Sequence, residues 1–130
     1  MFSRAAIDDN TITINGDGMQ TRDFIYSLDV GFGILSQALK FVNKDDINKI
    51  NMLGSGSSIN LWDVVSAVEL ASGKQLKYRQ ATAKTLLSTE PRDVVASKED
   101  ILDLLGNRIT PFQDGINNTY EYYKNLQMLK

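Results

Sequence analysis

The chain has 130 residues, of which 42% are hydrophobic and 23% are charged, and this balance indicates one globular domain with a hydrophobic core. A formal net charge of −2 argues against a protein that binds nucleic acid, because neutralising phosphates requires a dense basic face. The sequence contains no cysteine and no histidine, which excludes disulfides, zinc sites, thiol nucleophiles and Ser-His-Asp triads.

The sequence also bears on where the protein acts. No run approaches the roughly 20 apolar residues that cross a bilayer. The N-terminal segment becomes acidic at Asp8 and Asp9, too early for a secretory signal. We therefore expect no membrane association and a cytoplasmic location, with which the lack of cysteine agrees.

The predicted elements alternate between strands and helices. Residues 11–14 alternate β-branched apolar and polar side chains, which predicts a strand, and the glycines of 15–18 predict a turn after it. Further strands are predicted over residues 23–28, 49–53 and 76–78. The spacing of apolar residues predicts helices near 29–42, 61–72 and 98–105, and from 111 onward. Gly31 and Gly33 would cost the first of these helices roughly 1 kcal/mol each, which suggests that a neighbour packs closely there.

Residues at the helix boundaries support these assignments. Asn60 is the predicted N-cap of the helix that Gly73 ends, and Ser97 is the predicted N-cap of the helix that Gly106 ends. Residues 110–113 read Thr-Pro-Phe-Gln, which predicts a threonine N-cap, a proline in the first helical position and a capping box. The alternation of strands and helices favours an α/β arrangement.

Two short motifs resemble a cofactor-binding turn and a catalytic pair, but we interpret both as structural. The turn at 54–56 reads Gly-Ser-Gly, but the third glycine of a dinucleotide-binding turn is replaced by Ile59, so we interpret it as a strand-to-helix turn. Tyr120 and Lys124 have the Tyr-x-x-x-Lys spacing of a proton-transfer pair. Tyrosines at helical spacing are usually packing residues, and we expect that role here.

Two arginine–aspartate pairs are more informative. A glycine-flanked loop leads into Arg22 and Asp23, and an arginine placed so can bind a diphosphate through its planar set of donors. The alternative is a surface hairpin with an Arg–Asp ion pair. Arg92 and Asp93 lie in a long polar loop, where they either contact a ligand or are simply solvated.

These segments together resemble a known family. Residues 14–29 read Ile-Asn-Gly-Asp-Gly-Met-Gln-Thr-Arg-Asp-Phe-Ile-Tyr-Ser-Leu-Asp. This stretch resembles the Ile-Tyr-Gly-Asp-Gly-x-Gln-x-Arg-Asp-Phe-Val-Tyr-Val-x-Asp stretch of the extended short-chain dehydrogenase/reductase family, the nucleotide-sugar epimerases and dehydratases. Later segments resemble the same family in the same order, at residues 52–56, 72–74, 92–106 and 112–123.

The resemblance implies a set of substrate-binding residues. It places the family's diphosphate-binding arginine at Arg22 and its ribose-binding aspartate at Asp93, and it makes Gln20 a further candidate. A second diphosphate-binding arginine of the family falls on Glu90, and we hypothesise that the neighbouring Arg92 substitutes for it. The usual tyrosine and asparagine of the family are replaced by Asn15 and Met52, which leaves the sugar nucleotide undefined.

The resemblance also implies a fold and a division of labour. We expect an α/β fold with partial Rossmann-like C-terminal strand–helix units and a small mixed α+β substrate-binding subdomain. Residues 1–130 would form the C-terminal substrate-binding region. The family's NAD(P)-binding turn and catalytic Tyr-x-x-x-Lys would precede it, so we expect no catalytic, cofactor-binding or metal-binding residue in this chain.

The expected partners follow from the same division. The ligand would be a nucleotide-diphosphate sugar, and epimerisation, dehydration and reduction stay open as the reaction. The helix after Asp29 and the strand at Ile50 would pack against an N-terminal cofactor-binding segment, and without it their apolar faces would favour self-association. The alternative is a degenerate, non-enzymatic module that serves oligomerisation or protein interaction.

Overall fold

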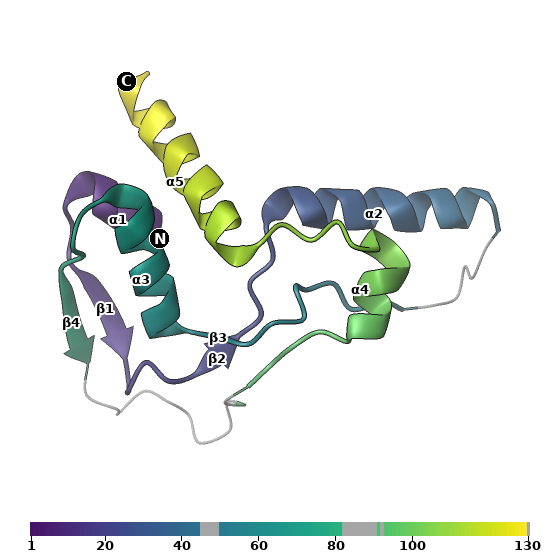
Figure 1. The fold of residues 1–130 in the computed structure, drawn as a ribbon, viewed down its shortest axis with the longest axis horizontal. Coiled ribbons are helices and arrows are strands. Elements are labelled where there is room, and N and C mark those ends of the chain that lie inside the picture. Colours follow the sequence, from purple (N-terminus) through teal and green to yellow (C-terminus); the bar gives the residue numbers. More distant parts are fainter. Residues whose placement is uncertain (45–49, 82–90, 92, 130) are drawn as a thin grey trace.

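The computed structural model of the protein describes residues 1–44, 50–81, 91 and 93–129. The elements in chain order are α1 (Phe2–Asp8), β1 (Ile12–Asn15), β2 (Thr21–Arg22), α2 (Ser27–Val42), β3 (Ile59–Asn60), α3 (Leu61–Ser72), β4 (Tyr78–Ala81), α4 (Lys98–Leu105) and α5 (Phe112–Met128). Helices and short strands are mixed along the chain, which confirms the predicted α/β class. Figure 1 shows α1, α3, β1 and β4 on one side and α2 with α4 on the other, with the β2–β3 pair between them.

The first group of elements holds the larger core. Strands β1 and β4 pair in parallel, with Ile12 opposite Tyr78, and helices α1, α3 and α5 pack against one another beside them. Ile14 of β1 and Val68 of α3 are fully buried in this core. Burial of such side chains stabilises each by roughly 1.5–3 kcal/mol, so β1 is firmly placed where it leads into the loop at 15–18.

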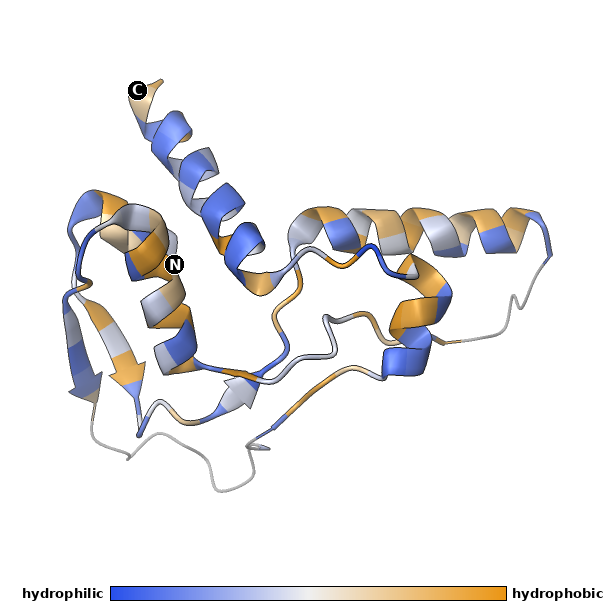
Figure 2. Ribbon diagram, in the orientation of Figure 1, coloured by the Kyte–Doolittle hydropathy of each residue, from blue (hydrophilic) through white to orange (hydrophobic). Residues whose placement is uncertain are grey.

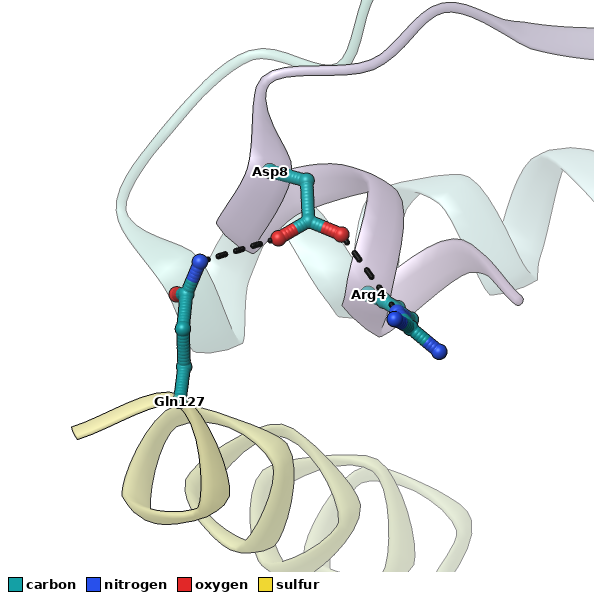
Figure 3. Close-up of polar contacts among 3 residues, drawn as sticks. All are labelled: Arg4, Asp8 and Gln127. Carbon is teal, nitrogen blue, oxygen red and sulfur yellow. Dashed lines mark hydrogen bonds and ion pairs between the residues drawn. The ribbon is translucent and has the colours of Figure 1, made fainter. Parts of the chain in front are cut away.

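Helix α1 is not predicted from the sequence pattern. Its buried residues are small: Ser3, Ala5 and Ala6. Asp8, in its last turn, accepts hydrogen bonds from Gln127 Nε2 at 3.0 Å and from Arg4 Nε at 3.4 Å (Figure 3). The helix is therefore stabilised by close contact with α3 and α5, which a window of local sequence does not reveal.

Three strand predictions need correction. The strand predicted over 23–28 is wrong, because β2 covers only Thr21–Arg22 and α2 begins at Ser27. Strand β2 pairs with the two-residue β3, and no strand of the described residues lies beside the apolar residues after Asp23. The strand predicted at 76–78 is shifted to Tyr78–Ala81, where β1 provides a partner. The described part of the predicted strand 49–53 forms no strand, because none of the described strands lies beside it.

Most of the predicted helix boundaries are confirmed. Asn60 caps α3 in a capping box, in which Asp63 N donates to Asn60 Oδ1 at 2.9 Å and Asn60 N donates to Asp63 Oδ2 at 3.3 Å. Gly73 ends α3 with a φ of 66°, and Gly106 ends α4 with a φ of 58°, both in the left-handed region that glycine tolerates. Ser97 is the N-cap residue of α4, although its side chain makes no capping hydrogen bond.

The predicted cap of the last helix is wrong. The N-cap of α5 is Pro111, and no side chain makes a capping hydrogen bond there. Thr110 N and Oγ1 instead donate to the buried carboxylate of Asp29, at 2.8 and 2.9 Å. Gln113 Nε2 donates to Ala67 O at 3.0 Å, so the capping-box residues are recruited by tertiary contacts.

Helix α2 has one close contact, and it carries exposed apolar residues on more than one side. A Cβ atom at Gly33 would lie 2.8 Å from Leu53 Cδ2, whereas one at Gly31 would meet nothing within 4 Å, so the expected close packing is confirmed at Gly33 only. Hydrophobic residues recur along the whole helix (Figure 2). The large ones among them that are more than half exposed are Leu28, Phe32, Ile34, Leu35, Leu39, Phe41 and Val42. Within the described part of the chain, none of the helices combines the length and the apolar character needed to span a bilayer.

Candidate substrate-binding site

Arg22 extends from β2 towards the loop that precedes α4. Its Nη1 donates to Thr21 O at 2.7 Å and to Pro91 O at 3.2 Å. The backbone of Arg22 is held in register by pairing with Ile59 of β3. Two carbonyl oxygens therefore fix one end of the half-buried guanidinium beside the segment that carries Asp93.

Asp93 is held by hydroxyl groups from two other segments. Its Oδ1 accepts hydrogen bonds from Ser58 Oγ and from Thr21 Oγ1, each at 2.5 Å. These two hydrogen bonds, with the nearby positive charge of Arg22, hold the pKa of the exposed Asp93 carboxyl below its usual range. An ionised, exposed acceptor thus lies next to an arginine, and the two sequence-predicted residues Arg22 and Asp93 are brought together.

Thr21 and Ser58 are site residues that the sequence reasoning missed. Thr21 occupies the variable position between Gln20 and Arg22, and Ser58 follows a serine–glycine turn, so neither carries a distinctive signal. Their common property is that each adjoins the β2–β3 pair, in which Thr21 lies opposite Asn60. The sequence did not predict this pairing of β2 with β3. A prediction of the pairing would have pointed to the hydroxyl groups of both Thr21 and Ser58.

Gln20 lies in a loop that Trp62 holds in place. Trp62 Nε1 donates to Asp17 O at 2.8 Å, and a Cβ atom at Gly18, where φ is +73°, would lie 2.5 Å from that nitrogen. Glycine is therefore required at position 18 for both its conformation and its size. Gln20 Nε2 donates to Asn15 O at 3.4 Å, and its buried Oε1 has no hydrogen-bond partner among the described residues.

Asp23 bonds to Ser55, Gly56 and Ala96 and thereby organises the turn at 54–56. Its carboxylate accepts hydrogen bonds from Ser55, Gly56 and Ala96, so the alternative of a simple surface pair between Arg22 and Asp23 is wrong. Burial alone would raise the pKa of Asp23, but the hydrogen bond from the Ser55 hydroxyl and those from the three backbone amides outweigh it and lower the pKa.

The remaining candidate functional residues either make structural contacts or lie outside the described part of the chain. The Gly54-Ser55-Gly56 turn packs against Asp23 and Ala96, but the predicted strand-to-helix turn is wrong, because the described residues before it form no strand and α3 begins only at Leu61. Tyr120 is buried in the larger core, and Lys124 Nζ bonds to Glu121 and lies 5.9 Å from the centre of the Tyr120 ring. Glu90 and Arg92 lie outside the described residues. Among those described, no cluster of acidic residues could hold a metal ion.

Comparison with solved structures finds proteins of similar fold. UDP-glucuronic acid 4-epimerase from Bacillus cereus, in complex with UDP-glucuronic acid and NAD, matches 96% of this chain with a TM-score of 0.79 and 28% sequence identity. The chain therefore shares its fold with one part of an extended short-chain dehydrogenase/reductase. A scan against protein-family models finds no match, and a search of curated proteins finds none either.

Two more distant members of the extended short-chain dehydrogenase/reductases share the fold. UDP-glucose-4-epimerase from Stenotrophomonas maltophila, with bound NAD and formylated UDP-arabinopyranose, matches 99% of the chain at 19% identity with a TM-score of 0.78. dTDP-glucose 4,6-dehydratase from Bacillus anthracis, in complex with NAD, matches 98% at 16% identity with a TM-score of 0.74. The chain spans only 38% to 40% of the length of these three proteins. The match therefore covers one part of the epimerase and dehydratase fold.

Proposed function

We propose that the chain is the nucleotide-sugar-binding portion of an NAD-dependent sugar epimerase or dehydratase of the cytoplasm. The observation that carries the proposal is the cluster of Arg22 and Asp93, a cation beside an ionised acceptor, at the exposed junction of β2, β3 and the loop before α4. A nucleotide sugar presents both a diphosphate and several hydroxyl groups. The cluster offers one group of matching chemistry for each of them.

Arg22 would bind the diphosphate. Among its contacts with the described residues only Nη1 is engaged, which leaves Nε and Nη2 to donate to phosphate oxygens. Asp93 would accept hydrogen bonds from ribose hydroxyls, since Thr21 and Ser58 engage only its Oδ1. Gln20 would contribute a further polar contact, and Arg92 a second positive charge near the diphosphate.

The cofactor and the catalytic groups would come from a complementary N-terminal segment. The row of exposed apolar residues on α2, together with Ile50, which is 93% exposed, supports this partnership. Burying them would contribute roughly 25 cal/mol per Å² of apolar surface removed from water. NAD, when bound by that segment, supplies hydride transfer, and the residues of this chain hold and orient the sugar nucleotide.

Titration calorimetry tests the proposal with UDP-glucose, UDP-glucuronic acid and dTDP-glucose, each added to the chain alone and to the chain mixed with an epimerase cofactor-binding segment. Arg22→Ala should weaken binding by roughly 10- to 100-fold, the loss of a charge-assisted hydrogen-bonded contact of about 1.5–3 kcal/mol. Arg79→Ala, which removes an exposed arginine that bonds only to Thr13 among the described residues, is the matched control and should bind like the wild type. Absence of binding in every mixture, or equal affinity of Arg22→Ala and wild type, would refute the proposal.

The exposed apolar residues of α2 also favour a second candidate function, a non-enzymatic oligomerisation or protein-interaction module. Light scattering with size-exclusion chromatography distinguishes the two. A tight oligomer that forms without ligand and is unchanged by sugar nucleotides supports the module. A chain that stays monomeric, and forms a one-to-one complex with a cofactor-binding segment, supports the first proposal and contradicts the second.

A further inference from the structure

The carboxylate of Asp23 joins two distant segments of the chain. Its Oδ1 accepts hydrogen bonds from Ser55 N and Ser55 Oγ, both at 2.6 Å. Its Oδ2 accepts from Gly56 N and from Ala96 N, both at 3.0 Å. One side chain therefore satisfies three backbone amides and one hydroxyl in two segments, 50–58 and 93–97, that form no helix or strand.

Each anchored point lies close in sequence to a member of the candidate site. Arg22 directly precedes Asp23, Ser58 lies two residues after Gly56, and Asp93 lies three residues before Ala96. Three residues extend at most about 10 Å, so an anchor at Ala96 restricts where Asp93 can be. The hydrogen bonds of Asp23 thus determine how the guanidinium, the hydroxyl and the carboxylate of the site meet.

The surroundings of Asp23 leave no room for another arrangement. A Cβ atom at Gly54 would overlap Asp23 Oδ2 and would lie 2.6 Å from Ala96 Cβ. A Cβ atom essentially never lies this close to a non-bonded atom, so any side chain at position 54 must displace the carboxylate or the segment of Ala96. The glycine at 54 is explained by this close approach, which requires the absence of a side chain.

Asparagine could not replace Asp23 in this role. An amide has one acceptor oxygen, and its NH2 group would point at two of the four donors that now converge on the carboxylate. Buried donors left unpaired cost about 1–3 kcal/mol each, so the two loops would separate from β2 or rearrange. The carboxylate is required as an acceptor on both of its oxygens.

We propose that Asp23 is a positioning residue that sets the mutual placement of Arg22, Ser58 and Asp93. The inference rests on the proposed function only where it concerns ligand affinity. Asp23 itself does not contact the sugar nucleotide. It acts through the turn at 54–56 and through Ala96, and Gly54 is the residue that makes room for it.

The experiment follows the 13C signal of the Asp93 carboxyl during an acid titration of the full chain, without ligand. In Asp23→Asn and in Gly54→Ala the pKa of Asp93 should rise towards its ordinary value, because the bonds from Ser58 and Thr21 are loosened. Removal of the Asp23 charge by itself would lower the pKa of Asp93, so a rise in Asp23→Asn reports lost geometry and not lost charge. Asp114→Asn, an exposed aspartate of α5, is the control and should leave the titration unchanged.

A second measurement separates this inference from the proposed function. Asp23→Asn should bind UDP-glucose about tenfold more weakly than the wild type, followed by the fluorescence of Trp62, the single tryptophan of the chain. If the wild type binds no sugar nucleotide but the pKa of Asp93 still rises in Asp23→Asn and Gly54→Ala, the proposed function is refuted and the positioning role is supported. An unchanged Asp93 titration in both variants overturns the positioning role. Should Asp23→Asn unfold, Ser55→Ala removes one of the four bonds and must give a smaller shift of the same sign.

Discussion

The buried pair of Asp29 and Thr110 gives the sharpest stability prediction. Asp29 lies in the first turn of α2 and is only 3% exposed. Its two oxygens accept from Thr110 N at 2.8 Å and from Thr110 Oγ1 at 2.9 Å. The contact joins the first turn of α2 to Thr110, which lies two residues before α5 begins. It thereby connects the two groups of elements that Figure 1 shows.

The expected magnitude follows from these two bonds. A hydrogen bond to a charged group contributes about 1.5–3 kcal/mol, so Asp29→Ala should lower the free energy of unfolding by about 3–6 kcal/mol. Domains of this kind are stable by only about 5–15 kcal/mol, so this is a large share of the total. Thr110→Val removes the hydroxyl bond alone and should cost about 1.5–3 kcal/mol.

Urea unfolding followed by circular dichroism measures these values, at two protein concentrations so that self-association is detected. Asp114→Asn is the matched control, because Asp114 also occupies the first turn of a helix but is exposed, and its loss should cost at most about 1 kcal/mol. In a double-mutant cycle, Asp29→Ala and Thr110→Val should couple by about 0.5–3 kcal/mol. Additive effects, or an Asp29→Ala variant as stable as Asp114→Asn, would show that the reasoning is wrong.

Three further predictions concern the hydrophobic core, the loss of stability at acid pH and the contact between α1 and α5. Ile14→Ala, at a fully buried position, should lower the free energy of unfolding by about 2–5 kcal/mol in urea, and a loss below 1 kcal/mol would contradict the assigned core. Because folding lowers the pKa of Asp23, its contribution to stability should be complete above the ordinary aspartate pKa of about 3.9 and should disappear as the pH falls through the lower folded value. Thermal melts from pH 6 to pH 2 should therefore show a smaller acid loss in Asp23→Asn than in wild type, and parallel curves would count against this. Gln127→Ala removes the bond to Asp8 (Figure 3) and should cost less than about 1 kcal/mol by urea unfolding, since both groups reach solvent; a larger loss would mean that this contact holds α1 on α5.

Local signals in the sequence were sufficient for several elements. The apolar period of 61–72, Asn60 before it and Gly73 after it all act within one helix, so the prediction of α3 needed no knowledge of the fold. The helix at 29–42 was found for the same reason, although α2 begins two residues earlier, at Ser27. The two arginine–aspartate pairs contained the candidates Arg22 and Asp93, and the resemblance to a known family selected these two.

Features that depend on a partner were missed or misassigned. The residues of 23–28 favour a strand by composition, yet a strand exists only where a second strand offers its hydrogen-bonding groups. Thr110 has the chemistry of an N-cap, but the buried carboxylate of Asp29 binds both its amide and its hydroxyl. The two hydroxyls that hold Asp93 belong to residues with no distinctive spacing, and only the pairing of β2 with β3 reveals them.

The sequence by itself determined the class of fold, helices α2, α3, α4 and α5, the capping of α3, and the two charged residues on which a ligand site could be built. These depend on the intrinsic preferences of residues and on interactions within a few positions, which a linear pattern contains. Tertiary structure alone decided that Asp23 accepts hydrogen bonds from two distant segments, that Thr21 and Ser58 donate to Asp93 and that apolar side chains of α2 stay exposed. Hydrogen bonds and burial between distant segments have no fixed sequence spacing, because they arise only when the chain has brought those segments together.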